Sequence, residues 1–245
     1  MDNFYSTPFY EWHRLGSRTS AEVVLPIIFE LIKPNSVVDV GCGTGTWLAV
    51  AKALGGRALV GYEGNWIKKA TWAEPGLDIR IGDLEKPLQM DRKFDLAICM
   101  EVAEHLSHAR SASLIADLCA LSDCILFSAA IPGQGGANHI NEQWQSYWAA
   151  LFDQNCFAML DIIRPAIWNN SSVEWWYRQN TFLYVERSRL KELNNLPAPQ
   201  SIVDIAHPEL VAAQSKERSI RMIISELRRA MTKTIKARLF RPSRA

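Results

Sequence analysis

Val37-Val38-Asp39-Val40-Gly41-Cys42-Gly43-Thr44-Gly45 is the stretch that decides the fold, because an apolar run passes through an acidic residue into three closely spaced glycines. The pattern predicts a buried strand, a tight turn and then a helix. Glycine is needed where the backbone adopts a positive φ or approaches a ligand closely, and the first N–H groups of a helix attract an anion. A nucleotide-type ligand site is therefore expected at this turn.

Four further apolar runs follow at the intervals of a βαβ arrangement, over residues 59–63, 79–83, 94–100 and 124–130. They predict an α/β protein with a doubly wound, mostly parallel sheet and helices on both faces. Glu63 ends the first of these runs about eighteen residues after Gly45, close to the spacing at which an acidic side chain accepts hydrogen bonds from ribose hydroxyls. Ligands of such sheets bind beyond the carboxyl ends of the strands.

Four motifs together resemble the class I S-adenosylmethionine-dependent methyltransferases: DVGCGTG at 39–45, GYEG at 61–64, GDLE at 82–85 and FDLAICMEVAEHL at 94–106. The resemblance covers about residues 20–185 and implies a Rossmann-like, seven-stranded sheet with S-adenosylmethionine as cofactor. A nicotinamide site is the competing interpretation. The dinucleotide pattern, however, requires a glycine at position 46, where this chain has threonine.

The resemblance also implies a role for each matching position. Asp39 and the turn of Gly41, Cys42, Gly43 and Gly45 would hold the methionine part of the cofactor, Glu63 the ribose hydroxyls, Asp83 and Leu84 the adenine, and Met100 would line the cofactor floor.

A second motif, Glu101-Val102-Ala103-Glu104-His105, places three ligand-type residues at positions i, i+3 and i+4, which would fall on one helical face. Joined to His139 on the loop after the fifth predicted strand, it resembles metal-dependent O-methyltransferases such as the small-RNA 2′-O-methyltransferases, and also the ubiquinone-pathway O-methyltransferases. That resemblance implies a divalent ion held by Glu101, Glu104, His105 and His139. The donors favour Mn²⁺, Fe²⁺, Co²⁺ or Zn²⁺ over Mg²⁺, although the small-RNA family accepts magnesium on a similar set.

A metal-free interpretation stays open, because E-V-x-E-H also occurs in relatives with no demonstrated metal. In that case His139 is the leading general base and His105 the second candidate.

Length and composition fit one catalytic domain with an appendage. The chain has 245 residues, of which 48% are hydrophobic and 22% charged, enough for a core of ordinary size. We expect an N-terminal arm and helix at 1–34, a cofactor-binding domain at 35–190, and a linker and basic helix at 191–245. The five cysteines form no C-x-x-C pair, and no leader or membrane-spanning run is evident, so a cytoplasmic enzyme is expected.

Three segments outside the predicted sheet are distinctive. An aromatic arm at 4–14 precedes a helix expected at 21–28, before Pro34-Asn35. The glycine-rich loop 131–144 and the segment 173–180 carry aromatic and amide side chains, which suit a sugar ring or another polyol but equally suit packing.

The C-terminal segment 213–245 carries ten Lys or Arg against two Glu, a net charge of +8, while the rest of the chain carries −7. Apolar residues recur in it at helical intervals, which predicts a basic amphipathic helix. It could lie on an anionic membrane, dock on a protein partner, contact a polyanion or fold back on its own domain. Because the rest of the chain is acidic, nucleic acid is disfavoured as the methyl acceptor.

The favoured function is therefore O-methylation of a sugar or a specialised-metabolite small molecule, with divalent-metal assistance. Two alternatives remain: N- or carboxylate methylation without metal, and a non-catalytic S-adenosylmethionine-binding module that recruits a partner.

Overall fold

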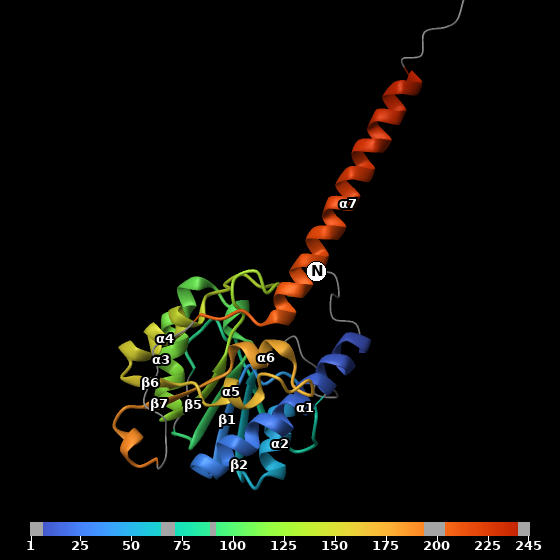
Figure 1. Ribbon diagram of the computed structural model, residues 1–245. Coiled ribbons are helices and arrows are strands. Elements are labelled where there is room, and N and C mark those ends of the chain that lie inside the picture. Colours follow the sequence, from blue (N-terminus) through green and yellow to red (C-terminus); the bar gives the residue numbers. More distant parts are fainter. Residues whose placement is uncertain (1–6, 65–71, 89–91, 194–203, 240–245) are drawn as a thin grey trace, which may run out of the picture. The chain divides into compact units, whose positions relative to one another are not determined.

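The computed structural model describes residues 7–64, 72–88, 92–193 and 204–239, and it divides into two compact units, Met1–Ile205 and Ala206–Ala245. The first unit contains a seven-stranded sheet (Figure 1). Its strands are β1 (Ser36–Val40), β2 (Ala58–Glu63), β3 (Asp78–Ile81), β4 (Leu96–Met100), β5 (Cys124–Ser128), β6 (Phe157–Leu160) and β7 (Phe182–Glu186). The second unit consists mainly of one helix, α7 (Pro208–Leu239).

The strand order is β3-β2-β1-β4-β5-β7-β6, with β1 to β5 parallel and β7 antiparallel to both of its neighbours. This confirms the predicted α/β fold with a doubly wound, mostly parallel sheet. All five predicted strands are present, within a few residues of their expected bounds.

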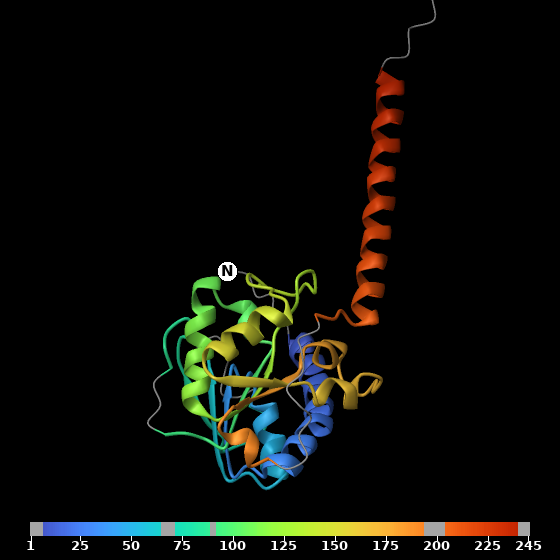
Figure 2. The same cartoon turned by 60° about the vertical axis from the view of Figure 1, so that its left-hand side comes forward.

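Helices cover both faces of the sheet (Figures 1 and 2). One face packs against α1 (Thr7–Ile32), α2 (Thr46–Ala53), α5 (Ile163–Ile167) and α6 (Trp175–Asn180), and the other against α3 (Ser111–Leu121) and α4 (Gln145–Gln154). The described part of this unit also contains the short 3-10 turns η2 (Ala103–His105), η3 (His108–Arg110) and η4 (Arg189–Lys191).

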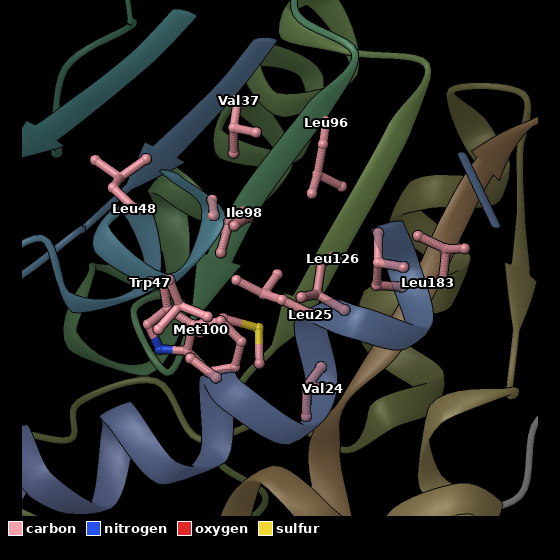
Figure 3. Close-up of a cluster of buried hydrophobic side chains, with 14 of the residues drawn as sticks. Val24, Leu25, Val37, Trp47, Leu48, Leu96, Ile98, Met100, Leu126 and Leu183 are labelled. Atoms are coloured by element: carbon pink, nitrogen blue, oxygen red, sulfur yellow. The ribbon is translucent and has the colours of Figure 1, made fainter. Parts of the chain in front are cut away.

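Successive residues of the central strands alternate between the two faces, as the pleat requires. In β4, Ile98 and Met100 belong to the core under α1 and α2, whereas Cys99 belongs to the core under α3 and α4. Figure 3 shows the first of these cores, where Met100 lies beside Trp47 of α2. Because β4 is fully buried, its sequence is apolar throughout.

The helix α1 begins fourteen residues earlier than predicted and runs through Pro26, so the expected start at residue 21 is wrong. The small polar residues that suggested a boundary are accommodated within the helix, because the Ser20 hydroxyl donates to the Gly16 carbonyl (2.7 Å) and Thr19 donates to the Leu15 carbonyl (3.2 Å). Part of the predicted aromatic arm, residues 4–6, lies outside the described residues.

The antiparallel strand β7 brings the end of α6 to the site. Its first residue, Phe182, pairs with Phe127 near the carboxyl end of β5. The end of α6, just before Phe182, therefore lies at the sheet edge where the parallel strands end. Residues from the loops after β1, β4 and β5 and from α6 thus meet at one edge.

Candidate functional site

Three glycines with positive φ form the turn between β1 and α2: Gly41 (+76°), Gly43 (+54°) and Gly45 (+81°). A Cβ on Gly41 would lie 2.3 Å from Cγ2 of Val102, so the turn packs against the loop after β4. Within the described chain, a Cβ on Gly43 would meet nothing within 4 Å. The turn is therefore closely packed at one glycine and open at another, as a backbone that receives a ligand requires.

Two buried carboxylates flank this turn. Asp39 is 2% exposed, and among the described residues its Oδ2 atom has no hydrogen-bond partner. Glu63 accepts hydrogen bonds from the N–H groups of Gly43 (2.5 Å) and Gly64 (2.7 Å). Burial and, secondarily, the charge of Glu63 raise the pKa of Asp39 well above its usual value. A buried oxygen without a partner and an open glycine turn fit the cofactor that the sequence implies, since its ammonium and hydroxyl groups are donors.

The raised pKa of Asp39 leads to a stability prediction. An acid whose pKa is raised in the folded state stabilises the fold below the unfolded-state pKa, about 3.9, and loses that contribution as the pH rises through the folded-state pKa. Asp39→Asn imitates the protonated form. In urea unfolding without added ligand at pH 8, the variant should therefore have its midpoint at a higher urea concentration than the wild type. This difference in midpoint should shrink as the pH is lowered towards 4. A variant midpoint at pH 8 equal to or below that of the wild type would contradict it.

The predicted adenine contacts lie after β3. Asp83 accepts a hydrogen bond from the N–H of Glu85 (3.0 Å), and it lines a hollow of about 420 Å³. The lining residues of this hollow are Tyr62, Gly82, Asp83, Lys86, Pro87 and Leu88. Leu84 and Met100 instead pack into the two hydrophobic cores, Met100 beside Trp47 (Figure 3). The roles assigned to Asp83, Leu84 and Met100 at the cofactor stay predictions.

Three of the four predicted metal ligands are brought together. Glu104, His105 and His139 each offer a ligand atom, and these atoms lie within 4.8 Å of one another. The two imidazole rings meet edge to face with their centroids 4.8 Å apart. The contact arises because the N–H groups of Ile140 and Asn141 donate to the Glu104 carbonyl (2.9 and 3.0 Å), which fastens the loop after β5 to η2.

The electrostatics of this cluster suit a cation. Glu104 is fully buried, and neither carboxylate oxygen has a hydrogen-bond partner in the described part of the chain. Burial and then the charge of Glu101 raise the pKa of Glu104 well above its usual value. His105 is an exposed residue, but partial burial of its ring and then the neighbouring His139 lower its pKa, which favours the neutral imidazole that ligates metals or accepts a proton. A divalent ion would supply the missing partner of Glu104.

Glu101 is the fourth predicted ligand, and the prediction that it shares a helical face with Glu104 and His105 is wrong. It has a φ of +55°, and only Ala103–His105 form a helical turn. The backbone of Glu101 is not helical because it makes a long-range contact. Its N–H donates to the Ser128 carbonyl (3.0 Å) beyond the end of β4. The Glu101 carboxylate instead accepts hydrogen bonds from the side-chain amides of Gln134 (2.8 Å) and Asn180 (3.2 Å).

Glu142 is a site residue that the sequence reasoning missed. Its carboxylate lies 3.0 Å from Nδ1 of His139 and accepts hydrogen bonds from the N–H groups of Gly133 and Gly135, both at 2.7 Å. It therefore fixes both the imidazole and the loop. A Cβ on Gly136 would lie 2.2 Å from Nε2 of His139, so only glycine admits the ring in this position. The spacing His-x-x-Glu at the end of a glycine-rich loop is the signal that could have indicated this pair.

Comparison with known proteins assigns the chain to a family. Residues 12–186 match the model of a family described as "Methyltransferase domain", which covers more than half of the chain. No curated protein matches the chain in sequence.

Several solved structures share the fold. DesVI from Streptomyces venezuelae is 14% identical with a TM-score of 0.54, over 72% of this chain and 96% of that one. The sugar N-methyltransferase KedS8 from Streptoalloteichus sp. ATCC 53650 is 14% identical with a TM-score of 0.58, over 76% and 95%. The magnesium protoporphyrin IX methyltransferase ChlM from Synechocystis PCC 6803, with bound SAH, is 18% identical with a TM-score of 0.51, over 76% and 97%. At these identities the likeness concerns the fold.

Proposed function

Because this chain belongs to the methyltransferase-domain family and is a class I S-adenosylmethionine-dependent methyltransferase, we propose that it methylates a hydroxyl oxygen of a sugar or another hydroxylated small molecule, with the help of a divalent metal. The observation that carries the proposal is the meeting of Glu104, His105 and His139 beside the glycine turn. A buried carboxylate that has no hydrogen-bond partner among the described residues, next to two imidazoles, is an arrangement that a cation stabilises.

The chain's own residues would bind and orient the two reactants. S-adenosylmethionine supplies an electrophilic methyl group on a sulfonium. Asp39 and the glycine turn would hold its methionine part and Glu63 its ribose, close to the loop after β4, because Gly41 packs against Val102. Proximity and alignment of the acceptor oxygen with the methyl group supply much of the rate of such transfers.

An alcohol needs help to react. Its pKa of about 15 lies roughly 8 to 9 units above that of a histidine, so complete proton transfer costs about 12 kcal/mol at 1.36 kcal/mol per unit. A divalent ion held by Glu104, His105 and His139 would lower the pKa of a hydroxyl bound to it. Because Nδ1 of His139 faces the Glu142 carboxylate, Nε2 is the nitrogen left to ligate or to accept a proton.

Aromatic and amide side chains of the loop after β5 and of α6 support a polyol acceptor. Trp144, at the start of α4, is 40% exposed, whereas Trp148 and Tyr177 are buried and belong to the core. The side-chain amides of Gln134, Gln179 and Asn180 form a hydrogen-bonded group next to Glu101. Exposed indole faces and side-chain amides are both groups that sugar-binding sites use.

Chelation tests the proposal directly. Protein stripped of metal should convert S-adenosylmethionine and a sugar with vicinal hydroxyls to a methylated product only after Mg²⁺, Mn²⁺, Fe²⁺, Co²⁺ or Zn²⁺ is returned, as measured by mass spectrometry. The acceptor panel should include amino sugars and carboxylic acids. Methylation of any of these that chelation leaves unchanged would replace the proposal by the metal-independent alternative, with His139 as the base. Binding of S-adenosylhomocysteine without turnover of any acceptor would favour the binding module.

A further inference from the structure

The helix α7 carries a stripe of exposed apolar side chains. Its members are Ile220, Ile223, Ile224, Leu227 and Met231, and each is 46–59% exposed. Their spacing of three, four, seven and eleven residues from Ile220 places them along one side of the helix, over about 16 Å at 1.5 Å per residue. Met222 is also exposed but falls on the opposite side by the same periodicity. A contiguous exposed stripe of this kind indicates an interaction surface.

Charge identifies the kind of partner. The segment that contains the stripe, residues 213–245, has a net charge of +8, whereas the rest of the chain has −7. Three exposed cations, Lys216, Arg221 and Arg228, lie on the same stretch of α7. Arg221 and Arg228 are seven residues apart and therefore line one flank of the stripe. The surface thus combines an aliphatic strip with positive charge beside it.

We propose that α7 lies in the plane of an anionic lipid surface, with the stripe among the acyl chains and the cations at the headgroups. A second copy of α7 would bring two strongly positive segments together, which Coulomb repulsion opposes. A nucleic acid would neutralise the charge but leave the aliphatic stripe in water. An anionic bilayer surface satisfies both features. Among the described helices, none combines the length and the apolarity of a membrane-spanning segment.

Flotation of the full chain with lipid vesicles tests the proposal. The protein should bind vesicles of phosphatidylcholine with phosphatidylserine, should not bind vesicles of phosphatidylcholine alone, and should be released by high salt. Ile223→Ser with Leu227→Ser should lower partitioning at least about 30-fold, because buried CH₂ groups are lost. Arg221→Gln with Arg228→Gln should lower it about 25-fold, roughly fivefold per charge. Met222→Ser is the matched control and should stay within about twofold of the wild type.

Binding of S-adenosylhomocysteine should be unchanged in all of these variants, which shows that each is folded and separates this test from that of the catalytic function. Failure of the wild type to bind anionic vesicles would overturn the proposal. So would equal losses for Met222→Ser and for the stripe variant. A dimer in sedimentation experiments that Leu227→Ser dissociates would assign the stripe to a second copy instead.

Discussion

Replacing Glu63 with alanine is expected to weaken the binding of S-adenosylhomocysteine by about 100-fold or more. A hydrogen bond to a charged group contributes about 1.5–3 kcal/mol, so the loss of two from ribose hydroxyls costs roughly 3–6 kcal/mol, and 1.4 kcal/mol corresponds to a tenfold change. The Glu63 carboxylate also accepts hydrogen bonds from the N–H groups of Gly43 and Gly64, so alanine releases the glycine turn as well. Isothermal titration calorimetry measures the effect.

The chain offers a matched control for this variant. Asp78 begins β3 and is largely exposed, so Asp78→Ala removes a nearby carboxylate without touching the turn and should bind like the wild type. Glu63→Gln keeps one acceptor oxygen, so its affinity for S-adenosylhomocysteine should lie between those of Glu63→Ala and the wild type. An affinity of Glu63→Ala within about threefold of the wild type would show that Glu63 does not hold the cofactor.

The sheet and the glycine turn were predictable from the sequence because both depend on local patterns. The run 37–40 is buried on both faces of the sheet and is apolar except for Asp39, and the glycines after it adopt the positive φ values that the turn requires. The predicted helical face of Glu101, Glu104 and His105 failed because the backbone of Glu101 pairs with Ser128, 27 residues later. A tertiary hydrogen bond decided the backbone conformation of Glu101, and the local sequence pattern does not predict such a bond.

The candidate site was predictable only in its separate parts. The approach of His139 to Glu104 depends on how the loop after β5 folds back onto η2, through the backbone of Ile140 and Asn141. Asn180 reaches Glu101 because β7 runs antiparallel to β5, which no spacing in the sequence reveals. Residue types thus indicated the chemistry, whereas the partners that orient them required the three-dimensional structure.

Replacing His139 with alanine is expected to abolish the response to metal and to lower kcat/KM by about 1000-fold. In the wild type, an ion at one hundred times its Kd should stabilise the stripped protein by about 2.7 kcal/mol, which raises the melting temperature by roughly 5–10 °C. Without His139 the cluster keeps Glu104 and His105 alone, too few ligands to hold the ion. Thermal melting of chelator-stripped protein with and without Mn²⁺ or Zn²⁺ measures this response.

The variant Glu142→Gln tests whether a residue that orients His139 matters as much as a residue that ligates the metal. Glu142 contacts Nδ1 of His139 but does not belong to the group of Glu104, His105 and His139. Loss of a carboxylate partner of a ligating histidine typically costs 10- to 100-fold in metal affinity, so this variant should need more metal yet recover activity when saturated. His108→Gln is the matched control, since His108 bonds Asn141 instead and should leave the metal response unchanged. Wild-type melting that no divalent ion shifts would refute the metal site, and a loss of activity in His139→Ala would then identify His139 as the base that takes the acceptor's proton.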